Sequence, residues 1–191
     1  MSAALVRNPN APQTFVDDLE SFLYVILWLA LVYSPSSMST PDLTSFINVV
    51  LDPKQYKGRG GNSKANFLIG RKDLEDLSFL ERPLLPPLLD ELAVLFAVRY
   101  ERKPSAQEED TLAELEQIGS QMVSQLPAWK YRERSQKLSS DPHTHVAQII
   151  KVAVAQRDKW PAADHAKVQP LIQEGVVGRG GRVVGICQTG H

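Results

Sequence analysis

Residues 22–33 read FLYVILWLALVY, twelve consecutive apolar residues that decide how this chain folds. Acidic residues lie just before the run, and Ser34-Pro35 follows it. The pattern predicts one helix over about 18–33 that has no polar face from Phe22 onward. Because a helix of this kind must be covered on every side, we expect the rest of the chain to pack around it.

The same run also decides between a soluble and a membrane protein. A membrane-spanning helix needs roughly 18 or more apolar residues, and shorter runs are more often buried core helices. We therefore expect a core helix, and keep a helical membrane-associated protein built around residues 19–33 as an alternative. Residues 1–7 contain neither a cationic segment nor a long apolar run, so the sequence predicts no signal peptide.

Composition narrows the class of protein. The 191 residues include 21 Lys and Arg against 22 Asp and Glu, for a formal net charge of −1. Such a chain has no basic footprint for nucleic acid or an anionic membrane. Cys187 is the single cysteine, which excludes an intramolecular disulfide and multi-cysteine zinc sites. The sequence thus favours an intracellular protein, cytoplasmic or nuclear and not secreted.

The organisation around the apolar run is predicted to be all-α. Residues 1–15 are expected to be an extended lead-in, 16–175 a helical domain and 176–191 a flexible glycine-rich tail. Asp17, three residues before Glu20, has the spacing of a capping box with Asp17 as the N-cap. Apolar periodicity predicts the other helices, and residues 53–65 and 127–141 are expected to be irregular. These helices cover residues 41–52, 64–80 (as one or two short helices), 88–102, 106–126, 142–159 and 161–172.

Few residues of the sequence suggest catalytic or binding chemistry. The glycine-rich segments 58–63 and 178–183 both fail the Gly-x-Gly-x-x-Gly pattern of phosphate-binding loops. His143 and His145 lack a third metal ligand at a suitable spacing, and Cys187 lies in the predicted tail. The sequence therefore predicts no catalytic, cofactor-binding or metal-binding residue.

The string around the acidic residues carries a family resemblance. Gln13-Thr14-Phe15-Val16-Asp17-Asp18-Leu19-Glu20-Ser21-Phe22-Leu23-Tyr24-Val25-Ile26-Leu27-Trp28 resembles the central helix of fungal-type protein kinases, and casein-kinase-like enzymes carry a related Asp-Asp-Leu-Glu-Ser string. Asn62-Ser63-Lys64-Ala65-Asn66-Phe67-Leu68 is similar to a later stretch of the same family. The resemblance covers roughly residues 13–105.

The resemblance implies a partial protein-kinase-like C-terminal lobe, in which helices pack around one buried central helix. It implies that Asp18 matches the aspartate that accepts hydrogen bonds from the catalytic-loop backbone of a kinase. Other residues of the string would supply the surface of the central helix. The structural residues that it implies are Asp18, Leu19, Glu20, Phe22, Leu27 and Trp28, with Val25 and Ile26 on the same helix.

The motifs of phosphotransfer are missing from this sequence. An active kinase needs a His-Arg-Asp catalytic loop, a metal-binding Asp-Phe-Gly and a strand lysine, and none of these occurs. We expect a truncated or degenerate family member, a pseudokinase that does not itself transfer phosphate from ATP to protein Ser/Thr. ATP and Mg would be expected only of an intact member. The alternative is a helical protein-interaction module with no enzymatic role and an unknown protein partner. In either case Asp18, without a catalytic loop, is expected to be at least partly exposed.

Overall fold

The structure is a computed structural model that describes residues 1–51, 60–119, 121–162 and 168–171. The described residues are mostly helical and form no strand; Ser36 and Phe79 make an isolated antiparallel bridge. The all-α prediction is therefore confirmed.

The apolar run forms the long helix α2, Phe15–Tyr33. It begins three residues earlier than predicted, because Thr14 rather than Asp17 is the N-cap. Asp17 is the third helical residue and accepts hydrogen bonds from the Thr14 amide (2.9 Å) and hydroxyl (2.6 Å). The assignment of Asp17 as the cap was wrong, and the capping box lies one turn upstream. Ser34, in an extended conformation before Pro35, ends the helix.

The remaining elements agree with the predicted pattern in part. The lead-in contains a short helix, and residues 127–140, expected to be irregular, form a full helix. The predicted helix over 161–172 is not seen at 161–162 or 168–171, and its other residues, like the tail 176–191, lie outside the described part. In chain order the elements besides α2 are α1 (Ala3–Arg7), α3 (Thr40–Phe46) with a π-helical turn (Ile47–Leu51), α4 (Gly60–Gly70), α5 (Lys72–Glu75), α6 (Leu85–Ala97), α7 (Ala106–Gln117), a 3-10 turn (Gln121–Gln125), α8 (Pro127–Ser140), α9 (Pro142–Ala155) and a 3-10 turn (Arg157–Lys159).

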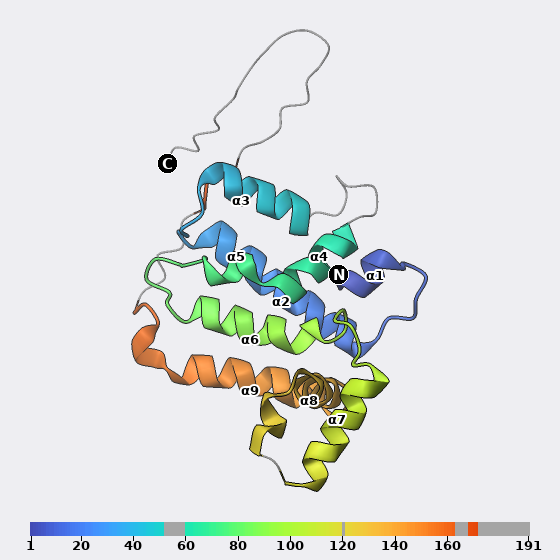
Figure 1. Cartoon of the computed structure of the whole chain (residues 1–191). Helices are drawn as coiled ribbons and strands as arrows, with labels where there is room; N and C mark the ends of the chain where they lie inside the picture. The colour runs from blue at the N-terminus through green and yellow to red at the C-terminus, as the bar shows by residue number, and fades with distance from the viewer. Residues whose placement is uncertain (52–59, 120, 163–167, 172–191) are drawn as a thin grey trace.

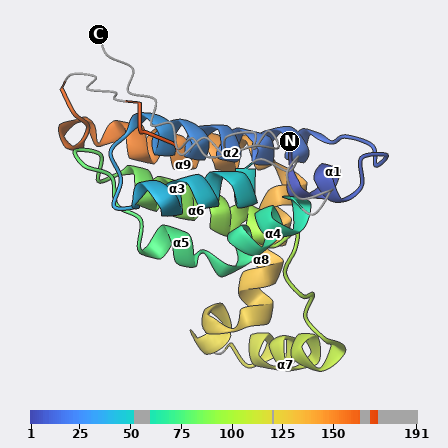
Figure 2. The ribbon, with the colours of Figure 1, turned by 90° about the horizontal axis from the view of Figure 1, so that it is seen from above.

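The helices α2, α6 and α9 run alongside one another, with α3, α4 and α5 packed on one side of them (Figures 1 and 2). Helix α8 lies across the end of this layer, and α7 extends outward from α8 (Figure 2). Helix α1 packs against α4. The layer therefore gives α2 close neighbours on its inner side.

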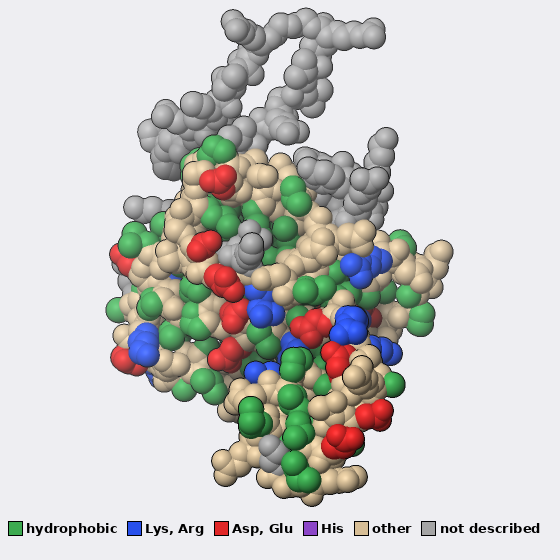
Figure 3. Space-filling model, viewed as in Figure 1, with side chains coloured by type: hydrophobic (Ala, Val, Ile, Leu, Met, Phe, Trp, Pro, Cys, Tyr) green, Lys and Arg blue, Asp and Glu red, His purple; other side chains and the backbone are tan. Residues whose placement is uncertain are grey.

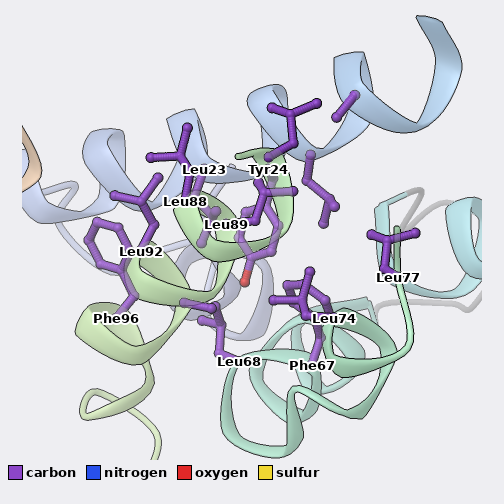
Figure 4. Packing of buried hydrophobic residues seen from close by; sticks show 14 of the residues in the cluster. Leu23, Tyr24, Phe67, Leu68, Leu74, Leu77, Leu88, Leu89, Leu92 and Phe96 are labelled. Carbon is purple, nitrogen blue, oxygen red and sulfur yellow. The ribbon is translucent and has the colours of Figure 1, made fainter. Parts of the chain in front are cut away.

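The hydrophobic core lies between α2, α4 and α6. Side chains of these three helices point toward one another, among them Leu23, Leu68, Leu89 and Phe96 (Figure 4). Leu27, one turn after Leu23, has 0% of its surface exposed, as predicted for the central helix. Burying a leucine of this kind contributes about 1.5–3 kcal/mol to stability, so the inner side of α2 anchors the fold.

The prediction that α2 is covered on every side was wrong. Beyond Phe15, which is 55% exposed at the start of the helix, its other side exposes five large apolar side chains over more than a third of their surface: Phe22, Val25, Trp28, Leu29 and Tyr33. We call these five residues the outer face of α2. The neighbouring described helices bury the inner side of α2 and leave these five side chains only partly covered. None of the described helices is long and apolar enough to cross a membrane.

Candidate functional site

The structure divides the residues of the resemblance between two surfaces of α2. Glu20 and Leu27 are fully buried on the inner side, and Leu19 is half-buried. Phe22 and Trp28 belong to the outer face. Asp18 is exposed, as predicted, and accepts a hydrogen bond from the side-chain amide of Gln13. The α2 helix therefore presents a buried polar site and an exposed apolar one.

The buried polar site is centred on two carboxylates one turn apart. Asp17 is 3% exposed and Glu20 is 0% exposed. Arg99, which follows α6, donates to both: one guanidinium nitrogen lies 2.7 Å from Asp17 Oδ1, and the other bonds Glu20 Oε2. The Tyr100 hydroxyl donates to Glu20 Oε2 at 2.7 Å. This arrangement, which we call the Glu20 cluster, ties the start of α2 to the end of α6.

The Glu20 cluster also holds the first residues of the chain. Ser2 Oγ donates to Asp17 Oδ1 at 2.7 Å, and the Ala3 amide donates to Glu20 Oε1 at 2.8 Å. The Ala4 amide donates to the Tyr100 hydroxyl at 3.0 Å. These contacts place α1 over the cluster, so the lead-in is a docked segment rather than an extended one.

Helix α4 supplies the other wall of this docking site. Lys64 Nζ donates to the Met1 carbonyl at 2.8 Å and lies 4.5 Å from the centre of the Tyr24 ring. Gly61 allows the close approach, because a Cβ at this position would lie 2.7 Å from the Ala3 carbonyl oxygen. Sequence reasoning noticed Lys64 only as part of the family resemblance and missed Arg99, Tyr100 and Ser2 altogether.

The protonation states of the Glu20 cluster follow from burial and its hydrogen bonds. Burial disfavours ionised Asp17, but hydrogen bonds from Thr14, Arg99 and Ser2 outweigh it and hold the pKa of Asp17 well below its usual range. Burial and the charge of Glu20 raise the pKa of Tyr100, so its hydroxyl stays protonated and continues to donate. No buried side-chain polar atom among the described residues lacks a hydrogen-bond partner. The hydrogen bonds of the cluster thus join α1, the start of α2 and the residues that follow α6.

The depressed pKa of Asp17 predicts a dependence of stability on acid pH. A carboxylate with a lowered folded-state pKa contributes stability above its ordinary value of 3.8 and loses that contribution as the pH falls toward its folded-state pKa. We expect Asp17 to account for a loss of about 1 kcal/mol between pH 6 and pH 3. Urea unfolding at both pH values measures it. The loss of stability between pH 6 and pH 3 should be about 1 kcal/mol smaller in Asp17→Asn than in the wild type. Equal losses in the two proteins would contradict the lowered pKa of Asp17.

The exposed site is the outer face of α2 together with an adjoining side of α9. Phe22, Val25, Leu29 and Tyr33 follow one another at helical spacing, and the Trp28 ring packs edge-on against Tyr33 at 6.0 Å. The face that Figure 3 shows differs in character, because acidic and basic side chains are interspersed there among apolar ones. The outer face of α2 contains no charged residue.

A ring contact joins the starts of α2 and α9, which pack against each other. The His143 ring lies 6.2 Å from that of Phe15. Residues 147, 150 and 154 continue the His143 side of α9 at helical spacing, so this side adjoins α2. Val154 is 51% exposed there. The apolar surface of α2 therefore continues onto α9.

The other sequence candidates do not form a site in the described residues. No group of three or more potential ligands is placed to hold a metal ion in that part of the chain, and His143 instead contacts Phe15. Gly60 to Ser63, expected to lie in a loop, form the start of α4. Residues 58–59, 178–183 and Cys187 lie outside the described residues.

In comparisons with known proteins, no family model, no curated protein and no solved structure matches this chain.

Proposed function

We propose that this chain is a non-catalytic helical binding module, built like part of the C-terminal lobe of a fungal-type protein kinase, and that it binds a protein partner through the outer face of α2. The resemblance of Gln13–Trp28 supports the kinase-like design. The lack of His-Arg-Asp and Asp-Phe-Gly in this sequence supports the non-catalytic role. The observation that carries the binding role is the exposure of large apolar side chains on the helix that anchors the core.

The size of this exposed surface supports a binding role. Five large side chains, each 37–50% exposed, leave roughly 400 Å² of apolar surface in one place. Patches of that size on a single protein are often functional. A helix meant only to fill a core needs no tryptophan, phenylalanine and leucine on its outer side, since polar residues there would favour solubility. The outer face of α2 is best explained as a surface that another polypeptide covers.

Site-specific crosslinking tests the proposal. A photo-crosslinking amino acid at Val25 should give a discrete adduct with a protein in cells of the source organism. The same group at Ile118, which is 75% exposed at the end of α7, serves as the matched control and should give none. Phe22→Asp should abolish the Val25 adduct, because it places a charge in the apolar surface.

Two results would contradict the proposal. Equal adducts from Val25 and Ile118 would show that the outer face of α2 is not a specific surface. Transfer of labelled phosphate from ATP to a generic protein substrate, above the level of a heat-treated control, would show that the chain is catalytic.

A further inference from the structure

We infer that the partner of the outer face of α2 is an amphipathic helix with a basic residue at one end, which packs along α2 beside α9 and pairs that residue with Asp18. This inference rests on the proposed function and specifies the chemistry of the partner. It rests on three features of the described residues: the spacing of the apolar side chains, the second wall that α9 provides, and the position of one exposed acid.

The spacing of the exposed residues suits a helix. Phe22, Val25, Leu29 and Tyr33 form a straight stripe, since they are separated by three or four residues. At 1.5 Å per residue the stripe is about 17 Å long, which matches about three turns of a partner helix. Partner helices of this kind present their own apolar residues at i, i+3 or i+4 and i+7.

Helix α9 gives the partner a second wall. The side of α9 that continues from His143 adjoins α2, and it carries Ala147, Ile150 and Val154. Ala147 and Ile150 are half-buried and Val154 is exposed. A helix resting on both α2 and α9 would bury more apolar surface than one on α2 alone, as helices do when a ridge of side chains fits between neighbouring rows.

Asp18 places a negative charge next to the outer face of α2. It lies one turn before Phe22 on the same stripe, and it is the only exposed charged side chain of α2, since Asp17 and Glu20 are buried. Helix α2 contains no basic residue. Phe15, which is 55% exposed, lies one turn before Asp18, so the carboxylate stands near the start of an otherwise uncharged apolar surface. It favours a lysine or arginine at the matching position of the partner and disfavours an acid there.

Two synthetic helical peptides test this inference on the full chain. Both carry leucine at i, i+3, i+7 and i+11. One peptide has a lysine one turn before the first leucine, and the other has a glutamate at that position. Fluorescence anisotropy of the labelled peptides measures their affinities. We expect the lysine peptide to bind about fivefold tighter, the size of effect that an exposed ion pair allows. Asp18→Lys should reverse the preference, because the residue is exposed and its replacement leaves the core unchanged.

Matched variants separate the inference from the proposed function. Leu29→Ser should weaken both peptides about tenfold or more, whereas Ile118→Ser, at an exposed position on α7, should change neither. If the two peptides bind equally well both to the wild type and to Asp18→Lys, while Leu29→Ser still weakens the binding of both, the inference is overturned. The proposed function is then left standing. No saturable binding at millimolar peptide, or binding insensitive to Leu29→Ser, would overturn both.

Two further results would assign the surface to another occupant. Sedimentation of the chain alone that shows a dimer, lost in Leu29→Ser, would identify a second copy as the occupant and overturn the inference. Displacement of the lysine peptide by a synthetic peptide of residues 172–191 would identify the chain's own C-terminal residues as the occupant, and would likewise overturn it.

Discussion

Replacing Arg99 with methionine is expected to lower the free energy of unfolding by about 3–5 kcal/mol, the cost of removing one partner from a buried ion pair. Arg99 donates to both Asp17 and Glu20, whose side chains are 4% and 0% exposed. Methionine keeps much of the side-chain volume but leaves two carboxylates close together in a poorly hydrated site. Urea unfolding followed by circular dichroism measures the loss.

Arg102→Met is the matched control for this prediction. Arg102 also pairs with a glutamate, Glu108, at 2.9 Å, but its side chain is 74% exposed. Exposed pairs contribute about 0–1 kcal/mol, so this variant should unfold close to wild type. Arg99→Lys should recover little of the loss, because one ammonium group cannot reproduce the fork that reaches both carboxylates. A loss below about 1 kcal/mol in Arg99→Met would show that the cluster does not hold α2 to α6.

The sequence places Asp17 and Glu20 on one side of the helix, but it shows neither that this side is the buried one nor which residue pairs with them. Residues 17, 20, 24, 27 and 31 follow one another at alternating spacings of three and four, which places both acids on the side of the helix that carries Leu27 and Leu31. Buried carboxylates require a cation or several donors. The partner, Arg99, lies 79 residues from Glu20, and nothing local distinguishes it from the other 20 basic residues.

The helices that sequence analysis missed have weak apolar patterns. Helix α8 reads PAWKYRERSQKLSS, and only Ala128 and Leu138 are buried. Its lysine, arginine, glutamate and glutamine are good helix formers, so intrinsic propensity rather than an apolar stripe would have revealed it. The five residues of α1 are too few for any periodicity, and their position depends on distant contacts with Glu20 and Tyr100.

The apolar pattern of α2 also explains why the prediction of its coverage was wrong. Its apolar residues continue around the whole helix, so hydropathy does not separate the side that packs on α4 and α6 from the side that faces outward. The expectation of an enclosed helix assumed that every apolar side is buried within the chain itself. In the structure one apolar side of α2 instead remains partly exposed, and the proposed binding role rests on that side.

Replacing Leu27 with alanine is expected to lower the free energy of unfolding by about 2–5 kcal/mol, because Leu27 is 0% exposed and its removal leaves a cavity in the core. Leu29→Ala provides a control on the same helix with the same change of side chain. Leu29 is 45% exposed, so its loss removes little packing and should cost about 0.5 kcal/mol or less. Thermal and urea unfolding of both variants measure the contrast. Equal losses would mean that Leu29 is as enclosed as Leu27 in the chain alone, and the outer face of α2 would then not be available to a partner.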